Sequence, residues 1–398
     1  MAATIQIIAN LQNNAATPIK ALREDIEGLG TGAEKSAGGF SKLQAAGAVA
    51  TGVLVAGITG AAVAMGSFLS DSVRMAADME AQVSNIAAVW DTTAQAISPV
   101  KDLIQDLGLD PNLKVTAEEA ALAIENLAKN GLTMDQVLQG AAYSTVLLAN
   151  ATGADFGTAA NVASDVMALF NIKAEDMKTA VDGITSVTVA SKFAIDDYAM
   201  ALAQGGGVAA QLGVSFADFN TALVATASYF KSGSDAGTSF KTFIQRLVPS
   251  TKEATEMMKS LGIITDETGN RFYDAEGNMQ SMAVIAGGLN ETISGLSEEQ
   301  KNMALTTMFG SDALRFAGAI AGYTTEEFLA LQKVMGDTDA LEQAKTRVDN
   351  FRGAWEIFMG VIDGLKLQIG SALLPALRML VEFLTGQLGG AGSAAIDR

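Results

Sequence analysis

Three places in the sequence hold residues that could do chemistry. Gly205, Gly206 and Gly207, followed by VAAQLG, have the composition of a phosphate-binding loop. Paired carboxylates at 118–119 and 196–197 have the residue type that general acid and base catalysis requires. The glycines, however, follow a helical pattern rather than a strand, and no Lys-Ser/Thr pair comes after them, so we expect a hinge between helices. The carboxylates fall at expected helix starts, where negative charge complements the helix dipole.

Composition removes most other kinds of active site. The 398 residues include no histidine and no cysteine, which excludes zinc and iron–sulfur sites, thiol nucleophiles and histidine-dependent triads. Two tryptophans and five tyrosines are few for the sugar-binding groove of a cell-wall hydrolase that works with carboxylates alone. The net charge of −18 repels a phosphate backbone. We therefore expect no enzymatic activity, no cofactor, no metal, and no sequence-specific nucleic-acid binding.

The elements that would position functional residues are almost all helices. The five prolines stand where helices begin, end or bend, and the tracts between them are rich in helix-forming residues. Three helix starts, at Thr116, Thr133 and Ser297, have the capping-box spacing of a hydroxyl residue three positions before Glu or Gln. The expected class is all-α, with long helices, helical hairpins, a short strand at 4–12 and one small β-hairpin at 262–280. Further helices are predicted at 155–170, 174–191, 195–212, 216–231 and 235–248.

Composition also divides the chain into four regions. Residues 1–42 hold a strand, a helix and a Gly-rich joint, and residues 43–115 hold a long helix that is first apolar and then amphipathic. Residues 116–335 form a compact helical core, and residues 336–398 form a C-terminal helical region with heptads. In the second region only glycine interrupts the helical pattern from Ser41 to Trp90, so a single helix is possible there.

Residues 43–70 carry no charge and are long enough to span a bilayer, for which about 20 residues suffice. Twelve of the 23 residues at 46–68 are Ala or Gly, so the drive into lipid is modest. Small residues recur every four positions, which favours close helix packing, at Ala48, Gly52, Ala56, Gly60 and Ala64. Three interpretations stay open: a tight bundle with other copies or the chain's own helices, a segment that packs first and enters a membrane later, and a transmembrane anchor.

The strongest periodic pattern lies near the C-terminus. Between 341 and 372 apolar residues alternate steps of three and four over more than four heptads. They are Leu341, Ala344, Val348, Phe351, Trp355, Phe358, Ile362, Leu365, Ile369 and Ala372. We expect one long helix, either packed on its own domain or forming the seam of a coiled coil or bundle between chains. The aromatic residues are bulky for a parallel dimer and suit a wider bundle. Pro375 then bends or restarts the helix.

Several stretches, taken in order, carry a resemblance to a known family. They are AADMEAQVSNIAAV (76–89), ALAIENLAKNGLTMDQVLQ (121–139), the run from YAMALAQGGG to FIQRL (198–247), LGIITDETGN (261–270), LSEEQKNMALTTMFGSDALR (296–315) and WEIFMGVIDGLKLQIGSALLPALRMLVEFL (355–384). Over roughly 70–390, the chain resembles the phage tail tape measure proteins, the phage-related minor tail protein family. No single stretch is specific, but their order and spacing are.

The resemblance implies a structural virion protein of the tail lumen, assembled in the host cytoplasm, around which tube subunits polymerise so that its helical length sets tail length. It implies as partners other copies of the chain, as a trimer or higher homo-oligomer, the tail tube protein, tail tip or baseplate proteins, and tail assembly chaperones. It also implies release at infection and help for DNA passage across the host membrane, which the segment 43–70 would serve. Family members are commonly much longer, so we expect a short tail, a fragment or processed form, or a secondary role in length control. The alternative function is a membrane-permeabilising, pore-forming protein.

Overall fold

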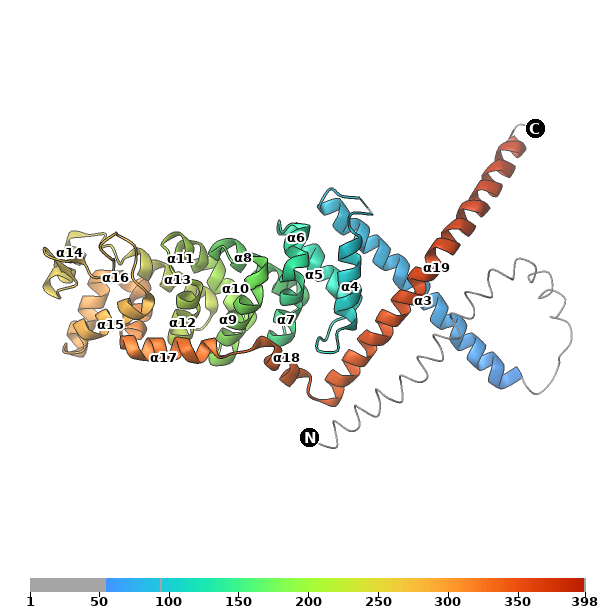
Figure 1. The fold of residues 1–398 in the computed structure, drawn as a ribbon. Helices are drawn as coiled ribbons and strands as arrows, with labels where there is room; N and C mark the ends of the chain where they lie inside the picture. Colours follow the sequence, from blue (N-terminus) through green and yellow to red (C-terminus); the bar gives the residue numbers. More distant parts are fainter. Residues whose placement is uncertain (1–54, 94, 397–398) are drawn as a thin grey trace. The chain divides into compact units, whose positions relative to one another are not determined.

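The computed structural model describes residues 55–93 and 95–396, and most of them are helical (Figure 1). The all-α class is therefore confirmed, with one two-stranded sheet among the described residues. The chain divides into two units between Ser67 and Phe68, and the second unit contains the helical body. The strand predicted at 4–12, the helix and Gly-rich joint that follow it, and the start of the long helix lie outside the described residues.

Helix α3, Val55–Val89, is unbroken over the described part of the predicted long helix. Its amphipathic half turns its apolar stripe inward, because Met79 and Ile86 are buried. Trp90 follows directly after the helix, and its indole Nε1 donates a hydrogen bond to the carbonyl oxygen of Leu132 at 2.8 Å. The stripe that the sequence predicted thus joins α3 to the body.

The body is a series of short helices joined by tight turns. In chain order the elements are α4 Ser98–Leu109, α5 Ala117–Lys129, α6 Met134–Gln136, η2 Val137–Ala141, α7 Ala142–Thr152, α8 Phe156–Phe170, η3 Ala174–Asp176, α9 Met177–Ala190, α10 Ile195–Ala201, η4 Leu202–Gly206, α11 Gly207–Gln211, α12 Phe216–Thr226, η5 Ala227–Tyr229, α13 Gly233–Gln245, α14 Lys252–Ser260, β1 Ile264–Thr265, β2 Gly269–Asn270, α15 Met282–Ile293, α16 Glu298–Ile320, α17 Thr325–Gly336 and α18 Ala340–Val348. The last helix is α19, Phe351–Ile396. Two of the segments, η2 and η4, are π-helical.

Helix starts follow the local capping signals. The predicted capping boxes at Thr116, Thr133 and Ser297 all form, with each hydroxyl accepting the N–H three residues on and the Glu or Gln side chain accepting in return. The same arrangement forms at Thr324 with Glu327, which the sequence analysis missed. These caps satisfy N–H groups that have no partner inside the helix, so they fix where each helix begins.

Aromatic side chains fill the core where α13 meets α16. The Phe243 ring centroid lies 5.0 Å from that of Phe309 and 5.2 Å from that of Phe316, and all three side chains are buried. On another side of α13, Gly233 and Gly237 lie directly against the backbone of α10. Large rings on one face and glycines on the other let this central helix pack closely on both neighbours.

After α16 the chain returns past earlier helices (Figure 1). Helix α17 packs on α15, α12 and α9, and α18 packs on α7 and α9. Helix α19 then contacts α4 and α5, at the beginning of the body. The last three helices therefore tie together elements that are far apart in the sequence.

The predicted hairpin at 262–280 is two smaller turns. The strands β1 and β2 pair antiparallel, with Thr265 opposite Gly269, so the first turn lies at 266–268. A separate bridge joins Tyr273 to Met279 around a second turn, in which Gly277 has a φ of +85°. The first turn lies before Gly269 and Asn270, which form β2, and the single hairpin expected at 262–280 is therefore divided in two.

Two parts of the body carry a similar short sequence motif. The motif GADFGT begins at Gly153 and GSDAGT begins at Gly233, 80 residues later. The first motif opens α8, which packs on α5, and the second opens α13, which packs on α10. The two motifs do not occupy equivalent positions, because Asp155 is the N-cap of α8 whereas Asp235 lies in the first turn of α13, after the N-cap Ser232.

Candidate assembly interface

The three glycines at 205–207 form neither a hinge nor a loop. They lie inside continuous helical turns, at the end of η4 and the start of α11, with helical φ and ψ at Gly206 and Gly207. A Cβ on Gly205 would lie 3.0 Å from the carbonyl oxygen of Gly237, so α13 packs against this backbone. The hinge prediction is wrong, because glycine here provides room for a neighbouring helix rather than freedom to bend.

The paired carboxylates lie at helix starts, as predicted. Glu119 accepts the backbone N–H of Thr116 at 2.8 Å. Asp197 accepts the N–H of Ala194 at 3.3 Å, and its other oxygen accepts the N–H of Gly233 at 3.0 Å, which ties the start of α10 to the start of α13. Among the described residues no group of three His, Cys, Asp or Glu could hold a metal ion.

The structure describes the helix of only three of the five residues in the predicted small-residue stripe. Ala48 and Gly52 precede residue 55, where the description begins. Ala56, Gly60 and Ala64 belong to helix α3, which gives them the four-residue spacing of one helix face. The packing role of this stripe stays a prediction.

The predicted seam at 341–372 is divided between two helices. Helix α18 ends at Val348 and α19 begins at Phe351, so the expectation of one continuous helix is wrong. Leu341 is half-buried and Ala344 is buried, because α18 packs on α7 within the same chain. The first part of the heptad pattern therefore belongs to the chain's own core.

Asn350 explains the break. Its side-chain oxygen accepts the N–H of Gly353 at 2.9 Å, and its side-chain nitrogen donates to the carbonyl oxygen of Arg347 at 2.9 Å. An asparagine that bonds nearby backbone groups in this way ends one helix and caps the next. Helix α19, by contrast, runs on through Pro375, where a restart had been one of the two expectations.

Helix α19 packs on the body and on α3 through glycines. We call the face made by Gly353, Gly360, Gly364, Leu367 and Gly370 the glycine face, and all five residues are buried. A Cβ on these glycines would collide with or crowd the facing groups, which are Val115 at Gly360, Leu109 at Gly364 and Ser72 at Gly370. This face was not predicted from the sequence, although the seven-residue spacing of Gly353, Gly360 and Leu367 was a signal for it.

The opposite side of α19 exposes large apolar side chains. Phe351 is 84% exposed, Trp355 52% and Phe358 48%. The three rings are neighbours along the helix. The centroids of Phe351 and Trp355 are 6.5 Å apart, and those of Trp355 and Phe358 are 5.6 Å apart. The same line continues through three half-buried residues, Ile362, Leu365 and Ile369. We call these six residues the outer stripe, of which the first three are exposed and the last three half-buried.

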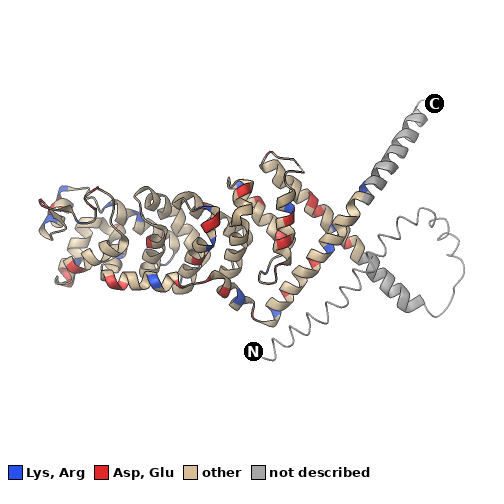
Figure 2. Cartoon of the chain, in the orientation of Figure 1, with Lys and Arg blue, Asp and Glu red and all other residues tan. Residues whose placement is uncertain are grey.

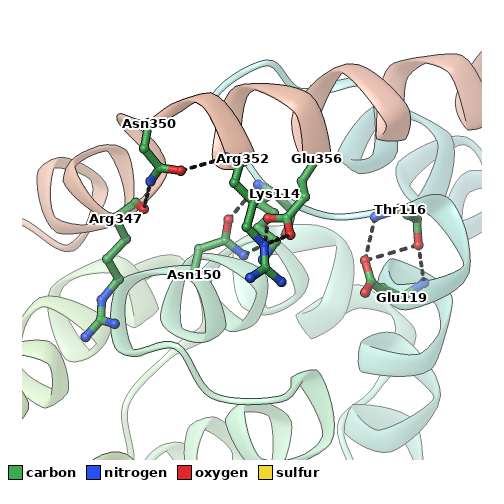
Figure 3. Close-up of polar contacts among 9 residues, drawn as sticks. Lys114, Thr116, Glu119, Asn150, Arg347, Asn350, Arg352 and Glu356 are labelled. Carbon is green, nitrogen blue, oxygen red and sulfur yellow. Dashed lines mark hydrogen bonds and ion pairs between the residues drawn. The ribbon is translucent and has the colours of Figure 1, made fainter.

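Polar contacts fix the start of α19 on the body (Figure 3). The Asn150 side chain accepts the N–H of Lys114 at 2.6 Å and donates to its carbonyl oxygen at 3.0 Å, which holds the segment between α4 and α5. The Lys114 Nζ lies 2.8 Å from one oxygen of Glu356, and the Arg352 Nε lies 2.9 Å from the other. Hydrogen bonds from Lys114 and then from Arg352 lower the pKa of the Glu356 carboxyl below its usual value.

Arg347 anchors the preceding helix in the same region. Its Nε donates to the carbonyl oxygen of Ala151 at 2.7 Å, at the end of α7. Gly153, two residues further on, has a φ of +78°, and a Cβ there would lie 3.0 Å from the guanidinium of Arg347. The turn from α18 into α19 is thus held by one bond to α7 and one ion pair to the segment before α5.

Charge is unevenly distributed along the sequence. Between residues 101 and 340 there are 30 Asp or Glu and 15 Lys or Arg, whereas residues 341–398 contain six of each. Charged side chains are scattered over the helices of the body rather than gathered in one patch (Figure 2). Within the described residues, Phe351–Pro375 is the one helical segment long and apolar enough to cross a membrane, judged by length and composition only.

A mostly helical body with close helix contacts and an exposed apolar stripe on its last helix is typical of a protein that works by association. The chain belongs to the phage-related minor tail protein family, whose model matches residues 101–310. The tape measure protein of Pneumococcus phage Dp-1 is a relative, 25% identical over 320 residues, which make up 80% of this chain and 27% of that protein. This chain thus spans about a quarter of the relative's length. No solved structure matches the chain.

Proposed function

We propose that several copies of this chain lie along the lumen of a phage tail and template the length of the tube that assembles around them. The observation that carries this proposal is the family match over 101–310 together with the similarity to a tape measure protein. Helix α19 supports it, because 46 helical residues correspond to about 69 Å of rigid length. On this proposal the chain is part of the virion and is assembled in the host cytoplasm.

The partners that this role requires are other tail components. Tube protein subunits surround the chain, tail tip or baseplate proteins hold one end, and tail assembly chaperones keep apolar segments apart before the tube closes. The outer stripe of α19 and the small-residue stripe of 43–70 are the surfaces that would need such protection.

Passage of DNA across the host membrane is a second part of the proposal. The uncharged segment 43–70, with its small residues at every fourth position, is long enough to cross a bilayer after the chain leaves the tail. The body, which has twice as many acidic as basic residues between 101 and 340, would repel the DNA that follows it rather than bind it.

A change in helix length tests whether the length of the chain sets the length of the tail. Phage particles are assembled with residues 351–378 duplicated, which adds four heptads and keeps the heptad phase. The tail should lengthen by about 42 Å in electron micrographs, at 1.5 Å per helical residue. The matched control inserts a Gly/Ser segment of equal length after Gly336, where a flexible chain adds no fixed rise. If the duplication, the Gly/Ser control and the wild type all had the same tail length, the proposal that the chain sets tail length would be wrong.

The alternative function, a membrane-permeabilising protein, is favoured by one observation, the membrane-length apolar segment Phe351–Pro375. A leakage assay with liposomes that contain a self-quenched dye distinguishes membrane permeabilisation from the structural role. Leakage caused by the purified full chain would support permeabilisation, and an inert chain would leave the structural role as the better proposal.

A further inference from the structure

Helix α19 contacts three segments of the chain in succession. The first contact is the ion pair of Glu356 with Lys114, in the segment between α4 and α5 (Figure 3). Further along, Gly364 lies against the end of α4, and Gly370 lies against α3. These contacts extend over about four turns of the helix. Helix α19 therefore reaches from the beginning of the body to α3.

The contacts of α19 bury few large side chains. Four of the five residues of the glycine face have no side chain, and Leu367 is the one large apolar residue that is buried in the described part of α19. Helix α13, in contrast, buries Phe240, Phe243 and Ile244. Because hydrophobic stabilisation grows with the apolar area removed from water, α19 is held less firmly than a helix of the core.

The contact between α19 and α3 is made by small residues. A Cβ on Gly370 would collide with the carbonyl group of Ser72 and the methyl group of Ala76, so the two helices meet at their backbones. Ser72 is buried, and its hydroxyl donates to the carbonyl oxygen of Phe68 in its own helix at 2.7 Å. Separation of the helices therefore leaves the hydrogen bond of this buried hydroxyl intact.

One polar contact links the two helices among the described residues. Eight positions beyond the crossing on each helix, the guanidinium of Arg378 donates a hydrogen bond to the carboxylate of Glu80. The two side chains are 62% and 46% exposed, so water and salt weaken their attraction. The pair can orient the helices, but it does not hold them together strongly.

We propose that α19 is a strap, a helix that fastens residues 68–80 of α3 to the body and opens as one unit while the body stays folded. Local opening of this kind is expected of elements with few buried apolar contacts. The strap would turn about the break at Asn350, because α18 stays bonded to α7 through Arg347 and Ala151. The end of α3 also stays in place, since Trp90 is bonded to Leu132.

The strap couples two helices that are far apart in the sequence. Arg378 and Glu80 are 298 positions apart, and Ser72 and Ala76 lose their cover when α19 leaves. A partner or a force that draws α19 from the body thus also frees the first part of α3. This inference goes beyond the proposed function, which concerns tail length, although the use of the strap when the chain leaves a tail rests on that function.

Hydrogen exchange of the purified full chain, followed by mass spectrometry of its peptides, tests the strap. Gly364→Leu should force α19 away from Leu109, against which Gly364 lies. Exchange should become about tenfold faster in peptides from both 68–80 and 357–372, and it should stay unchanged in α13. Because the nearest neighbours of Gly364 belong to α4, faster exchange in α3 measures the coupling.

Ala372→Leu is the matched control, since it places the same side chain at an exposed position of the same helix. Its exchange should equal that of the wild type. Faster exchange of the Gly364→Leu variant in α19 alone would overturn the proposal, because the two helices would then open separately. Faster exchange throughout the body, or none at all, would also overturn it.

A charge exchange tests the contact with α3 by a milder change. Arg378→Glu should accelerate exchange at 68–80 by up to about fivefold, as loss of an exposed ion pair allows. Lys301→Glu changes the net charge equally but breaks a pair within α16, so it should have no effect there. Adding Glu80→Arg to Arg378→Glu restores the pair and should restore the wild-type rate. A double variant as fast as Arg378→Glu would contradict the contact.

The strap and the proposed function fail separately, because exchange is measured on the purified chain and tail length on particles. Coupled opening in a chain whose helical duplication leaves tail length unchanged would keep the strap and remove the control of tail length. Separate opening of α3 and α19, together with a longer tail, would remove the strap and keep that control.

Discussion

At the scale of single residues, the closest helix contacts depend on glycine, because it has no side chain to separate the two backbones. Helix α13 crosses α10 at Gly237, where a Cβ would lie 2.5 Å from the carbonyl oxygen of Ala201. Gly288 lies inside helix α15, and a Cβ there would have no heavy atom within 4 Å. The same residue type thus provides close contact at one position and only lowers helix propensity at the other.

Alanine substitutions should separate these two roles. Gly237→Ala should lower the free energy of unfolding by about 1–3 kcal/mol, because a methyl group in a filled crossing forces the helices apart. Gly288→Ala should raise it by about 0.5–1 kcal/mol, because alanine has the higher helix propensity and nothing obstructs it. Both changes in the free energy of unfolding can be measured by urea denaturation, with circular dichroism as the signal. If Gly237→Ala left the free energy of unfolding unchanged, α10 and α13 could move apart without loss of stability.

The sequence does not distinguish these roles, because both kinds of glycine occur within helical patterns. The run at 205–207 was interpreted as a hinge because it follows a helical pattern and no Lys-Ser/Thr pair comes after it. The residue that decides the matter is Gly237, which lies about 30 positions away and faces Gly205 only in the folded chain. A contact of that kind has no local signal.

At the scale of elements, helix starts were predictable and tertiary partners were not. Capping boxes depend on residues three positions apart. The helix starts at Thr116, Thr133 and Ser297 can therefore be predicted from local sequence, without knowledge of the tertiary structure. The apolar pattern at 341–372 was also real, but it was assigned to one helix. Asn350 divides it, and the docked face of α19 is made of glycine rather than of the large residues that the pattern emphasises.

The ion pair between Lys114 and Glu356 makes the docking of α19 depend on pH. Because the pKa of Glu356 is lower in the folded chain than in the unfolded one, its stabilising contribution is fully present above the unfolded value. The contribution is lost as the pH falls through the folded pKa, which lies below the ordinary value of 4.5. The partners are partly exposed, so the contribution is at most about 1 kcal/mol.

Glu356→Gln should therefore destabilise the chain at pH 7 by up to about 1 kcal/mol and have no effect well below pH 4. Unfolding in urea at both pH values measures the difference from the wild type. Glu342→Gln is the control, since its partner Lys345 lies in the same helix and does not join α19 to the body. An equal loss at both pH values would contradict an ionic contact and point to packing by the glutamate stem.

At the scale of the whole molecule, charge separates the body from the C-terminal region. The body has an excess of acidic residues, and residues 341–398 are neutral. Like charges on neighbouring bodies repel, whereas neutral α19 helices do not. On the proposal that several copies lie side by side in a tail, contact through the neutral C-terminal region costs less electrostatic free energy than contact between bodies.

Self-repulsion within one body has a measurable consequence for stability. Raising the ionic strength from about 0.01 M to 0.1 M shortens the Debye length from about 30 Å to 10 Å, which screens repulsion between separate helices more than it weakens short ion pairs. The melting temperature of the chain should therefore rise with sodium chloride. Glu267→Gln, which removes one exposed charge near the sheet, should give a small gain at low salt that disappears at high salt. A melting temperature that falls with salt would mean that ion pairs such as Lys114 with Glu356 outweigh the repulsion, and the acidic excess would then have no structural cost.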